Sequence, residues 1–190
     1  MTVRSCLFAC LVALVAPLAS ASEPVTLKLD PGASHAKFTL GSTLHTVHGE
    51  MPILEGALRF DPNGGDATGD VVLDARGAVT GNTKRDKKMH QRVLQSATFP
   101  ELVFHLTRIE GALPSRGSAE LRLVGTLELL GSGHEVVIPA TVSRTGSTVE
   151  GRAAVSVPYV EWGLEDPSVF VLRADKEVQV ELDIRGELDR

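Results

Sequence analysis

The chain has 190 residues and a formal net charge of −5, with 24 acidic side chains against 19 basic ones. Aromatic residues make up only 4% of it, and an acidic chain with so few aromatic residues does not fit a nucleic-acid-binding protein. The two cysteines, Cys6 and Cys10, lie near the N-terminus, so the rest of the sequence offers no disulfide, thiolate nucleophile or cysteine metal ligand.

Residues 1–21 have the three parts of a secretory signal peptide. Arg4 gives a positive start, an apolar run follows, and residues 19–21 are the small residues of a cleavage site. The run is too short for a membrane span, so we expect a periplasmic or secreted protein with one domain over 22–190 that does not cross a membrane. The alternative is a lipoprotein with lipid on Cys10, but the apolar run would then lie mostly after the cleavage point.

Alternation of apolar and polar residues predicts β-strands along the rest of the chain. Each strand would have one dry face and one wet face. The predicted strands are 25–30, 34–40, 55–61, 68–76, 101–107, 118–131, 134–142, 148–159 and 176–188.

Short turns rich in glycine, proline and aspartate separate these strands, for example at 30–32, 61–65, 131–133 and 145–147. Short links join antiparallel neighbours. About nine strands in one small domain would leave exposed edges in an open sheet, and closure into a barrel removes them. The sequence therefore predicts an all-β, antiparallel barrel.

One segment, 81–100, breaks the alternation and predicts a short helix over about 83–95. Thr83 is placed to cap it, and Asp86 stands three residues later, which is the spacing of a capping box. Apolar residues recur every four positions from Met89. Its cations are Lys84, Arg85, Lys87, Lys88 and Arg92. They form either a solvated helix face or a clamp for an anionic group at the mouth of a cavity.

The sequence contains no nucleophile elbow, phosphate-binding glycine loop or helical zinc-protease motif, so we expect no enzyme. His45 and His48 are candidate metal ligands. Residues three apart in a strand point to opposite faces, so a site with His35 would need a bulge. A His-based metalloprotein stays an alternative to ordinary histidines at the rim or outer face of the barrel.

The interior of a barrel this size is either filled by side chains or holds one ligand. Small inward residues favour a cavity; they are Gly56, Gly69, Gly125, Gly151 and Ala153. An apolar cavity selects a chain-like hydrophobic ligand, because burial contributes about 0.8 kcal/mol per methylene. A filled barrel that acts through its surface, as an interaction or stress module, is the alternative. Trp162, at the end of a predicted strand, either plugs one barrel end or touches the ligand; we favour the plug.

Six segments resemble, in order and spacing, the YceI-like family of secreted lipid-binding barrels. They are 27–40, 47–51, 56–62, 80–90, 99–105 and 123–139. The most specific is TGNTKRDKKMH, which is similar to the family's Thr-Gly-Asn…Arg-Asp…Leu segment from Thr80 to Met89. The chain departs from the family at 93–95, where paired phenylalanines are common, and at 161–173, which is longer than the usual connection.

The resemblance implies an extended, lipocalin-like barrel around an apolar tunnel, with Arg85 and Asp86 fastening the helix beside it. It implies a non-catalytic protein that holds an isoprenoid, a quinone or a fatty-acyl ligand for transport, storage or stress protection. No other cofactor is expected. The expected partner is this hydrophobic small molecule, with no nucleic acid, and the protein is expected to be a monomer or a homodimer.

Strand parity, together with the family's tunnel, predicts which side chains line the cavity. They are Phe38, Leu40, Leu44, Val47, Phe60, Met89, Leu94, Phe104, Leu127 and Val155. Three histidines are predicted to meet a polar head group: His45, His48 and His90.

Overall fold

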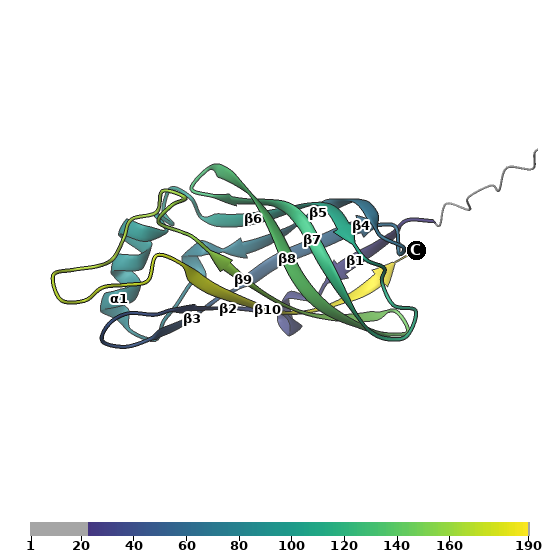
Figure 1. Cartoon of the computed structure of the whole chain (residues 1–190), viewed down its shortest axis with the longest axis horizontal. Helices are drawn as coiled ribbons and strands as arrows, with labels where there is room; N and C mark the ends of the chain where they lie inside the picture. Colours follow the sequence, from purple (N-terminus) through teal and green to yellow (C-terminus); the bar gives the residue numbers. More distant parts are fainter. Residues whose placement is uncertain (1–22, 190) are drawn as a thin grey trace, which may run out of the picture.

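The computed structural model describes residues 23–189, which form an elongated barrel with one helix beside its end (Figure 1). The predicted signal peptide and both cysteines lie outside the described residues. The strands are β1 (Val25–Leu29), β2 (His35–Leu40), β3 (Val47–Met51), β4 (Ile53–Phe60), β5 (Gly65–Asp74), β6 (Glu101–Glu110), β7 (Gly117–Leu129), β8 (Ser132–Thr145), β9 (Thr148–Val157) and β10 (Val178–Asp189). The helical elements are η1 (Pro31–Ala33), η2 (Ala75–Gly77), α1 (Thr83–Lys88) and the π-helical turn η3 (Met89–Val93).

All neighbouring strands are antiparallel, and β10 closes the barrel. One edge of β10 pairs with β9, while the other pairs first with β2 and then with β1. The turn η1 lies between β1 and β2, and Pro52 lies between β3 and β4. When each of these two pairs is counted as one interrupted strand, the ten strands make an eight-stranded barrel. The predicted all-β barrel is confirmed. β3 was not among the predicted strands, because it has only five residues, with Gly49 at its centre.

The predicted helix is present, but its cap differs from the prediction. Asn82, not Thr83, is the N-cap: its side chain accepts hydrogen bonds from the main-chain nitrogens of Lys84 and Arg85, both at 3.1 Å. Asp86 therefore does not complete a capping box with Thr83. The helix is α-helical through Lys88 and then widens into η3, where the Leu94 nitrogen donates to the Met89 oxygen at 2.8 Å.

Two apolar clusters form the core. The first contains Leu27, Leu58, Phe60 and Ile109, and belongs to the barrel end that holds both ends of the described chain. The second contains Leu94, Leu129, Val157, Tyr159 and Leu164, at the α1 end. The interior between them is not filled by side chains.

Candidate functional site

A cavity of about 640 Å³ occupies the barrel interior. Its volume lies within the range of pockets that hold small molecules, about 300–1,000 Å³. Its wall is mostly apolar and draws on strands around the whole barrel. Representative side chains are Phe38 from β2, Val71 from β5, Phe104 from β6, Leu127 from β7, Ile138 from β8, Val155 from β9 and Leu182 from β10. The barrel is therefore a container and not a solid core.

Strand alternation places these side chains. On β9 the apolar wall residues are Gly151, Ala153, Val155 and Val157, and on β10 they are Val178, Val180, Leu182 and Ile184. Every second residue faces the interior, as expected for pleated strands. The intervening residues, such as Arg152 and Asp183, face outward and pair with each other at 3.1 Å.

The prediction of a cavity used five small residues, and only two of them, Gly151 and Ala153, line the cavity. The other three serve close packing instead. A Cβ on Gly56 would lie 2.5 Å from Leu29, one on Gly69 would lie 2.0 Å from the Ala57 oxygen, and one on Gly125 would lie 2.2 Å from the His105 oxygen. Their missing side chains give space to strand neighbours and not to a ligand.

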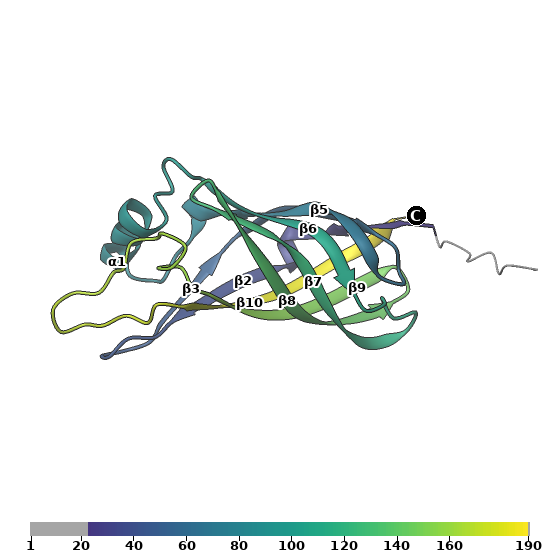
Figure 2. The same cartoon turned by 45° about the horizontal axis from the view of Figure 1, so that its top comes forward.

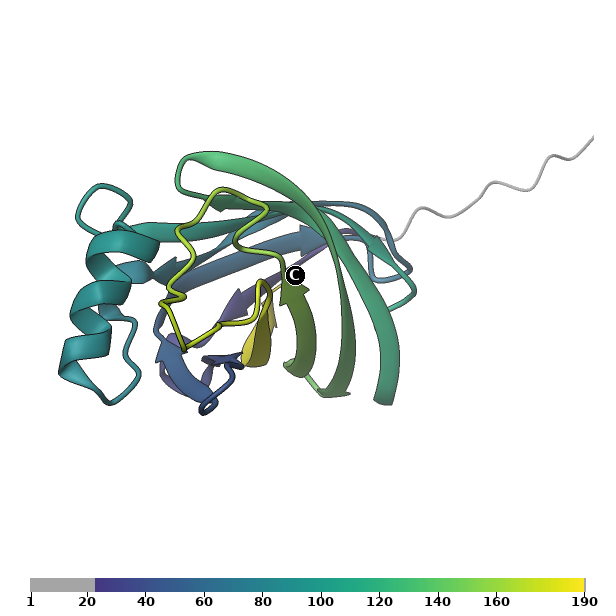
Figure 3. The ribbon, with the colours of Figure 1, turned by 60° about the vertical axis from the view of Figure 1, so that its left-hand side comes forward.

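The cavity wall includes Lys84, Arg85 and Lys88 of α1, so the cavity reaches the barrel end beside which α1 stands. Figure 3 shows this end of the barrel. Two loops also lie at this end: residues 41–46, between β2 and β3, and residues 158–177, between β9 and β10. In the view of Figure 3 the second loop crosses in front of the end of the barrel. Most of the polar side chains of the wall gather here. They include Ser42, His45, Thr80, Lys84, Arg85, Lys88, Arg92, Glu165, Asp166 and Ser168. We call this end the mouth.

The cations of the mouth fall into two groups. Arg85 is engaged with Thr80, and Arg92 pairs with Glu165 at 2.5 Å. Lys84 and Lys88 line the cavity, are exposed, and make no ion pair with any residue between 23 and 189. They stand one helical turn apart on α1, so both ammonium groups are available to an anion at the mouth.

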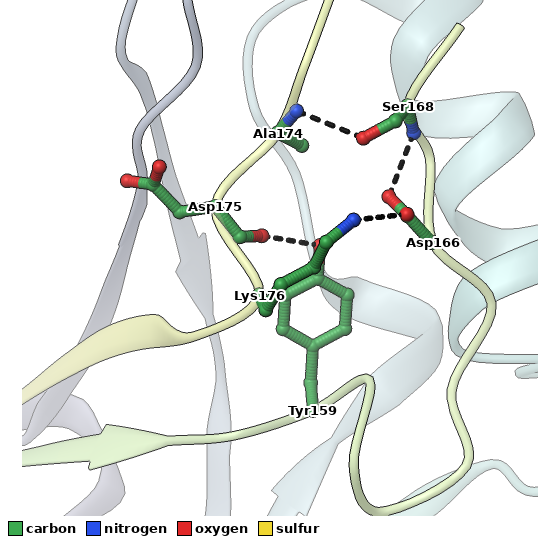
Figure 4. Close-up of polar contacts among 6 residues, drawn as sticks. All are labelled: Tyr159, Asp166, Ser168, Ala174, Asp175 and Lys176. Carbon is green, nitrogen blue, oxygen red and sulfur yellow. Dashed lines mark hydrogen bonds and ion pairs between the residues drawn. The ribbon is translucent and has the colours of Figure 1, made fainter.

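The β9–β10 loop is held by a set of polar contacts at its base (Figure 4). The Asp166 carboxylate pairs with the Lys176 ammonium and accepts from the Ser168 nitrogen at 2.9 Å. The Ser168 hydroxyl in turn accepts from the Ala174 nitrogen at 2.9 Å. The hydrogen bond from Lys176, assisted by Ser168, lowers the pKa of Asp166 to about 2, so this carboxylate is charged at ordinary pH.

Tyr159 fixes the same loop from the barrel side. Its buried hydroxyl donates to the main-chain oxygen of Asp175 at 2.8 Å, as Figure 4 shows. Burial, with the nearby carboxylates of Asp166 and Asp175, raises the pKa of Tyr159 to about 12. The phenol is therefore neutral and keeps its proton for this hydrogen bond.

Trp162 stacks on His134, with ring centroids 4.3 Å apart and planes inclined by 4°. It packs against the second core cluster and is not part of the cavity wall. This position agrees with a plug over the barrel end. Leu164, two residues later, does reach the cavity.

The structure brings nine of the thirteen predicted site residues to the cavity wall. They are Phe38, Leu40, Val47, Met89, Leu94, Phe104, Leu127, Val155 and His45. Their contact with a ligand stays a prediction.

The other four residues lie outside the wall. Leu44 is 65% exposed in the β2–β3 loop, where strand parity no longer applies. Phe60 points inward but is buried in the first core cluster. His48 lies beside Thr39, 3.1 Å from its hydroxyl, and His90 lies 3.0 Å from the Ser96 hydroxyl.

Sequence reasoning missed the contribution of the β9–β10 loop. Residues 164–169, with Leu172 and Ala174, form part of the wall at the mouth. The unusual length of this connection was the available signal.

Among residues 23–189 there is no cluster of three or more histidine, cysteine, aspartate or glutamate side chains arranged to hold a metal ion. Within the same residues, no helix has both the length and the apolar character that a membrane crossing requires.

Comparisons with known proteins agree with this architecture. A solved polyisoprenoid binding domain from Saccharophagus degradans is similar with a TM-score of 0.69 and 16% identity, over 86% of this chain and 98% of that one. BcnA from Burkholderia cenocepacia is similar with a TM-score of 0.65 and 15% identity, over 83% and 98%. The YCEI protein of Campylobacter jejuni gives a TM-score of 0.55 and 15% identity, over 74% and 86%.

These TM-scores show that the chain shares its fold with the three proteins. No curated protein matches the chain significantly. The sequence model of the YceI-like domain matches residues 27–186, which is most of the chain. The chain therefore belongs to the YceI-like family.

Proposed function

We propose that this protein is a non-catalytic carrier of a long apolar ligand of isoprenoid, quinone or fatty-acyl type. The observation that carries the proposal is the apolar cavity of about 640 Å³, which has most of its polar side chains at one end. Such a site fits a molecule with a long hydrocarbon chain and one polar head. The similar domain of Saccharophagus degradans is described as polyisoprenoid binding, which supports an isoprenoid among these classes.

The energetics favour a chain-like ligand. Each methylene moved from water into an apolar site contributes about 0.8 kcal/mol, so ten of them contribute roughly 8 kcal/mol before the cost of ordering the ligand. The wall also offers few hydrogen-bonding groups away from the mouth. A polar ligand would lose its water there without replacement, which disfavours it.

The mouth supplies a preference for the head group. Lys84 and Lys88 both line the cavity there, so we propose that they face a phosphate or carboxylate head. The leader-like residues 1–21 support a periplasmic or secreted location, where the protein would move, store or protect such a ligand.

The first test is native mass spectrometry of the full chain expressed with its own leader, followed by solvent extraction and lipid analysis. We expect a discrete excess mass that extracts as a prenyl or acyl compound. A bare mass, together with no uptake of farnesol or a short-chain ubiquinone added later, would refute the carrier proposal and return the interaction module to first place.

The head-group preference has its own test, because farnesol and farnesyl phosphate share one chain and differ only in charge. Lys84→Ala with Lys88→Ala should weaken binding of farnesyl phosphate about tenfold and leave farnesol unchanged. Lys87→Ala is the matched control, since Lys87 is exposed on the same helix but does not line the cavity. Equal losses for both ligands would show that the lysines shape the mouth and do not bind an anion.

A further inference from the structure

The mouth carries an exposed apolar tip. In the β9–β10 loop, Val169 is 61% exposed, Phe170 fully exposed at 102%, and Val171 76% exposed. Leu44, in the β2–β3 loop, is 65% exposed. We call these four residues the mouth tip. Figure 2 shows both loops projecting beyond the strands at the α1 end, away from the two ends of the described chain.

The position of the two central residues is unusual for their type. The Val169 nitrogen donates to the Leu172 oxygen at 2.9 Å, so Phe170 and Val171 occupy the centre of a tight turn. Glycine, asparagine, aspartate and proline dominate such positions, because they suit the backbone and are well solvated. A phenylalanine and a valine there gain nothing from the fold. Residues that break a local rule without structural gain point to a function.

The two loops of the tip are joined to each other. The Thr43 nitrogen donates to the Arg173 oxygen at 2.9 Å, and the Thr43 hydroxyl donates to the Val171 oxygen at 3.2 Å. The ion pair of Asp166 with Lys176 holds the base of the longer loop. The apolar side chains are therefore presented together on a fixed support and not on a loose strand of chain.

The surroundings of the mouth tip specify the partner. Lys84, Lys87 and Lys88 are exposed on α1 at the same end, and none makes an ion pair with any residue between 23 and 189. Of the acidic residues of the loop, Glu165 and Asp166 are paired with cations, while Glu161 and Asp175 make no ion pair with any residue between 23 and 189. An apolar tip beside unpaired lysines is complementary to a surface with an apolar interior and negatively charged groups on its outside.

The tip is also continuous with the cavity. Val169 belongs to the tip and lines the cavity, and Leu172, which closes the turn, lines it as well. An apolar path therefore runs from the barrel interior to Phe170. A bilayer placed against the tip would therefore lie next to the mouth of the cavity.

We propose that the mouth tip docks on a lipid bilayer that carries anionic lipids, with Phe170 and Val171 inserted at the acyl boundary and the α1 lysines on the head groups. Interfacial apolar side chains and nearby cations are the two terms that hold a protein on such a surface. The inference rests on the proposed function in one respect, because it gives the ligand its source and destination in the membrane.

The test is co-sedimentation of the full chain with vesicles of phosphatidylcholine alone and of phosphatidylcholine with phosphatidylglycerol. We expect binding to the anionic vesicles, weakened by raising the salt concentration from 0.1 to 1 M. Phe170→Ser with Val171→Ser should weaken it about tenfold or more, because two large apolar side chains no longer leave water. Val137→Thr is the control, since Val137 is an exposed apolar residue of β8 outside the tip, 42% exposed.

A second readout places the tip directly. In a Trp162→Phe background, Phe170→Trp gives one tryptophan, whose emission should shift to the blue with anionic vesicles and be quenched by brominated lipids. Binding that persists in the Phe170→Ser, Val171→Ser variant, or a tryptophan that stays in water, would overturn the proposal. So would a dimer of the wild type that the serine variant dissociates, because a second copy would then be the occupant.

Ligand uptake separates this proposal from the carrier function. Farnesol delivered from solution should bind the serine variant as well as the wild type. Uptake without vesicle binding would refute docking alone, and vesicle binding without uptake would refute the carrier proposal alone.

Discussion

Arg85 holds Thr80 by two hydrogen bonds, from Nε to the threonine hydroxyl at 2.7 Å and from Nη2 to the main-chain oxygen at 2.9 Å. Asp86 binds the same threonine, because its carboxylate accepts hydrogen bonds from the Thr80 nitrogen at 2.9 Å and from the Thr80 hydroxyl. Adjacent residues of α1 thus grip one threonine just before the helix begins. This contact fixes α1, and with it Lys84 and Lys88, at the mouth.

Arg85→Leu should lower the free energy of unfolding by about 1–3 kcal/mol, because charged hydrogen bonds are lost and the partly buried Thr80 oxygen loses a donor. Urea unfolding followed by circular dichroism measures this. Lys87→Leu, on the exposed side of the same helix, should change the value by less than about 0.5 kcal/mol. Equal effects of the two substitutions would mean that the grip on Thr80 does not stabilise the fold.

Ala153→Phe should block ligand uptake while the protein stays folded. Ala153 lines the cavity, whereas its neighbour Ala154 is exposed on the outer face of β9. Open space around Ala153 accepts the ring, so the usual overpacking cost of about 1–3 kcal/mol should largely be avoided. Fluorescence titration with a fatty-acid probe compares Ala153→Phe with Ala154→Phe. Loss of binding in both, or in neither, would place the ligand elsewhere.

Gly49→Ala should destabilise the barrel by about 1–3 kcal/mol, because the Phe38 ring lies on this glycine. A Cβ at Gly49 would lie 2.1 Å from the ring, so the ring must turn into the cavity. Thermal unfolding measures the loss, and ligand titration should show weaker uptake. At Gly32 a Cβ would meet its nearest atom at 3.4 Å, so Gly32→Ala should be nearly neutral. Unchanged unfolding of the Gly49 variant would show that Phe38 moves freely.

The contact of His105 with Asp70 on the outer face depends on pH. His105 Nδ1 lies 2.6 Å from the Asp70 carboxylate, and Nε2 lies 3.5 Å from that of Glu128. The hydrogen bond to Asp70 is the main reason that the pKa of His105 is raised above 6.5. A raised pKa in the folded state stabilises the fold fully below the unfolded pKa, and the stabilisation is lost as pH rises through the folded value.

Asp70→Asn should therefore lower the pKa of His105 and cost stability at pH 5, while wild type and variant converge above the folded pKa. Proton NMR titration of His105 and urea unfolding at several pH values measure both effects. Asp66→Asn, on the same strand and exposed, is the control. A stability gap that widens as pH rises would contradict the argument.

The barrel was predictable because its signal repeats at every second residue. One side chain in two meets the interior, so the alternation in β9 and β10 encodes both the strand and its inward face. The helix cap was not predictable in the same way. Asn82 and Thr83 are both capping residues, and spacing alone favoured Thr83. Which of the two residues caps the helix depends on the hydrogen bond between Asp86 and Thr80, and local sequence does not encode this contact.

Parity tells which way a side chain points but not how deep in the barrel it lies. Phe38 and Phe60 both point inward, yet one lines the cavity and the other is buried in the first core cluster. Parity also fails in loops, which is why Leu44 was assigned to the wall and lies on the surface. For the β9–β10 loop, the tertiary contacts that bring Leu172 to the cavity have no periodic trace in the sequence.

Among residues 23–189, the main chain of β3 on its edge opposite β2 makes one reciprocal pair of hydrogen bonds, each 2.9 Å, between Glu50 and Val79. Between that point and the mouth, this edge of β3 has no paired strand among residues 23–189, so the sheet is not continuous there. The amide hydrogens along this edge should exchange with deuterium sooner than those of β7 and β8, which are paired over their whole shared length. We therefore expect β2 and β3 to move more readily than the far end of the barrel, so that the width of the mouth changes without unfolding of the protein.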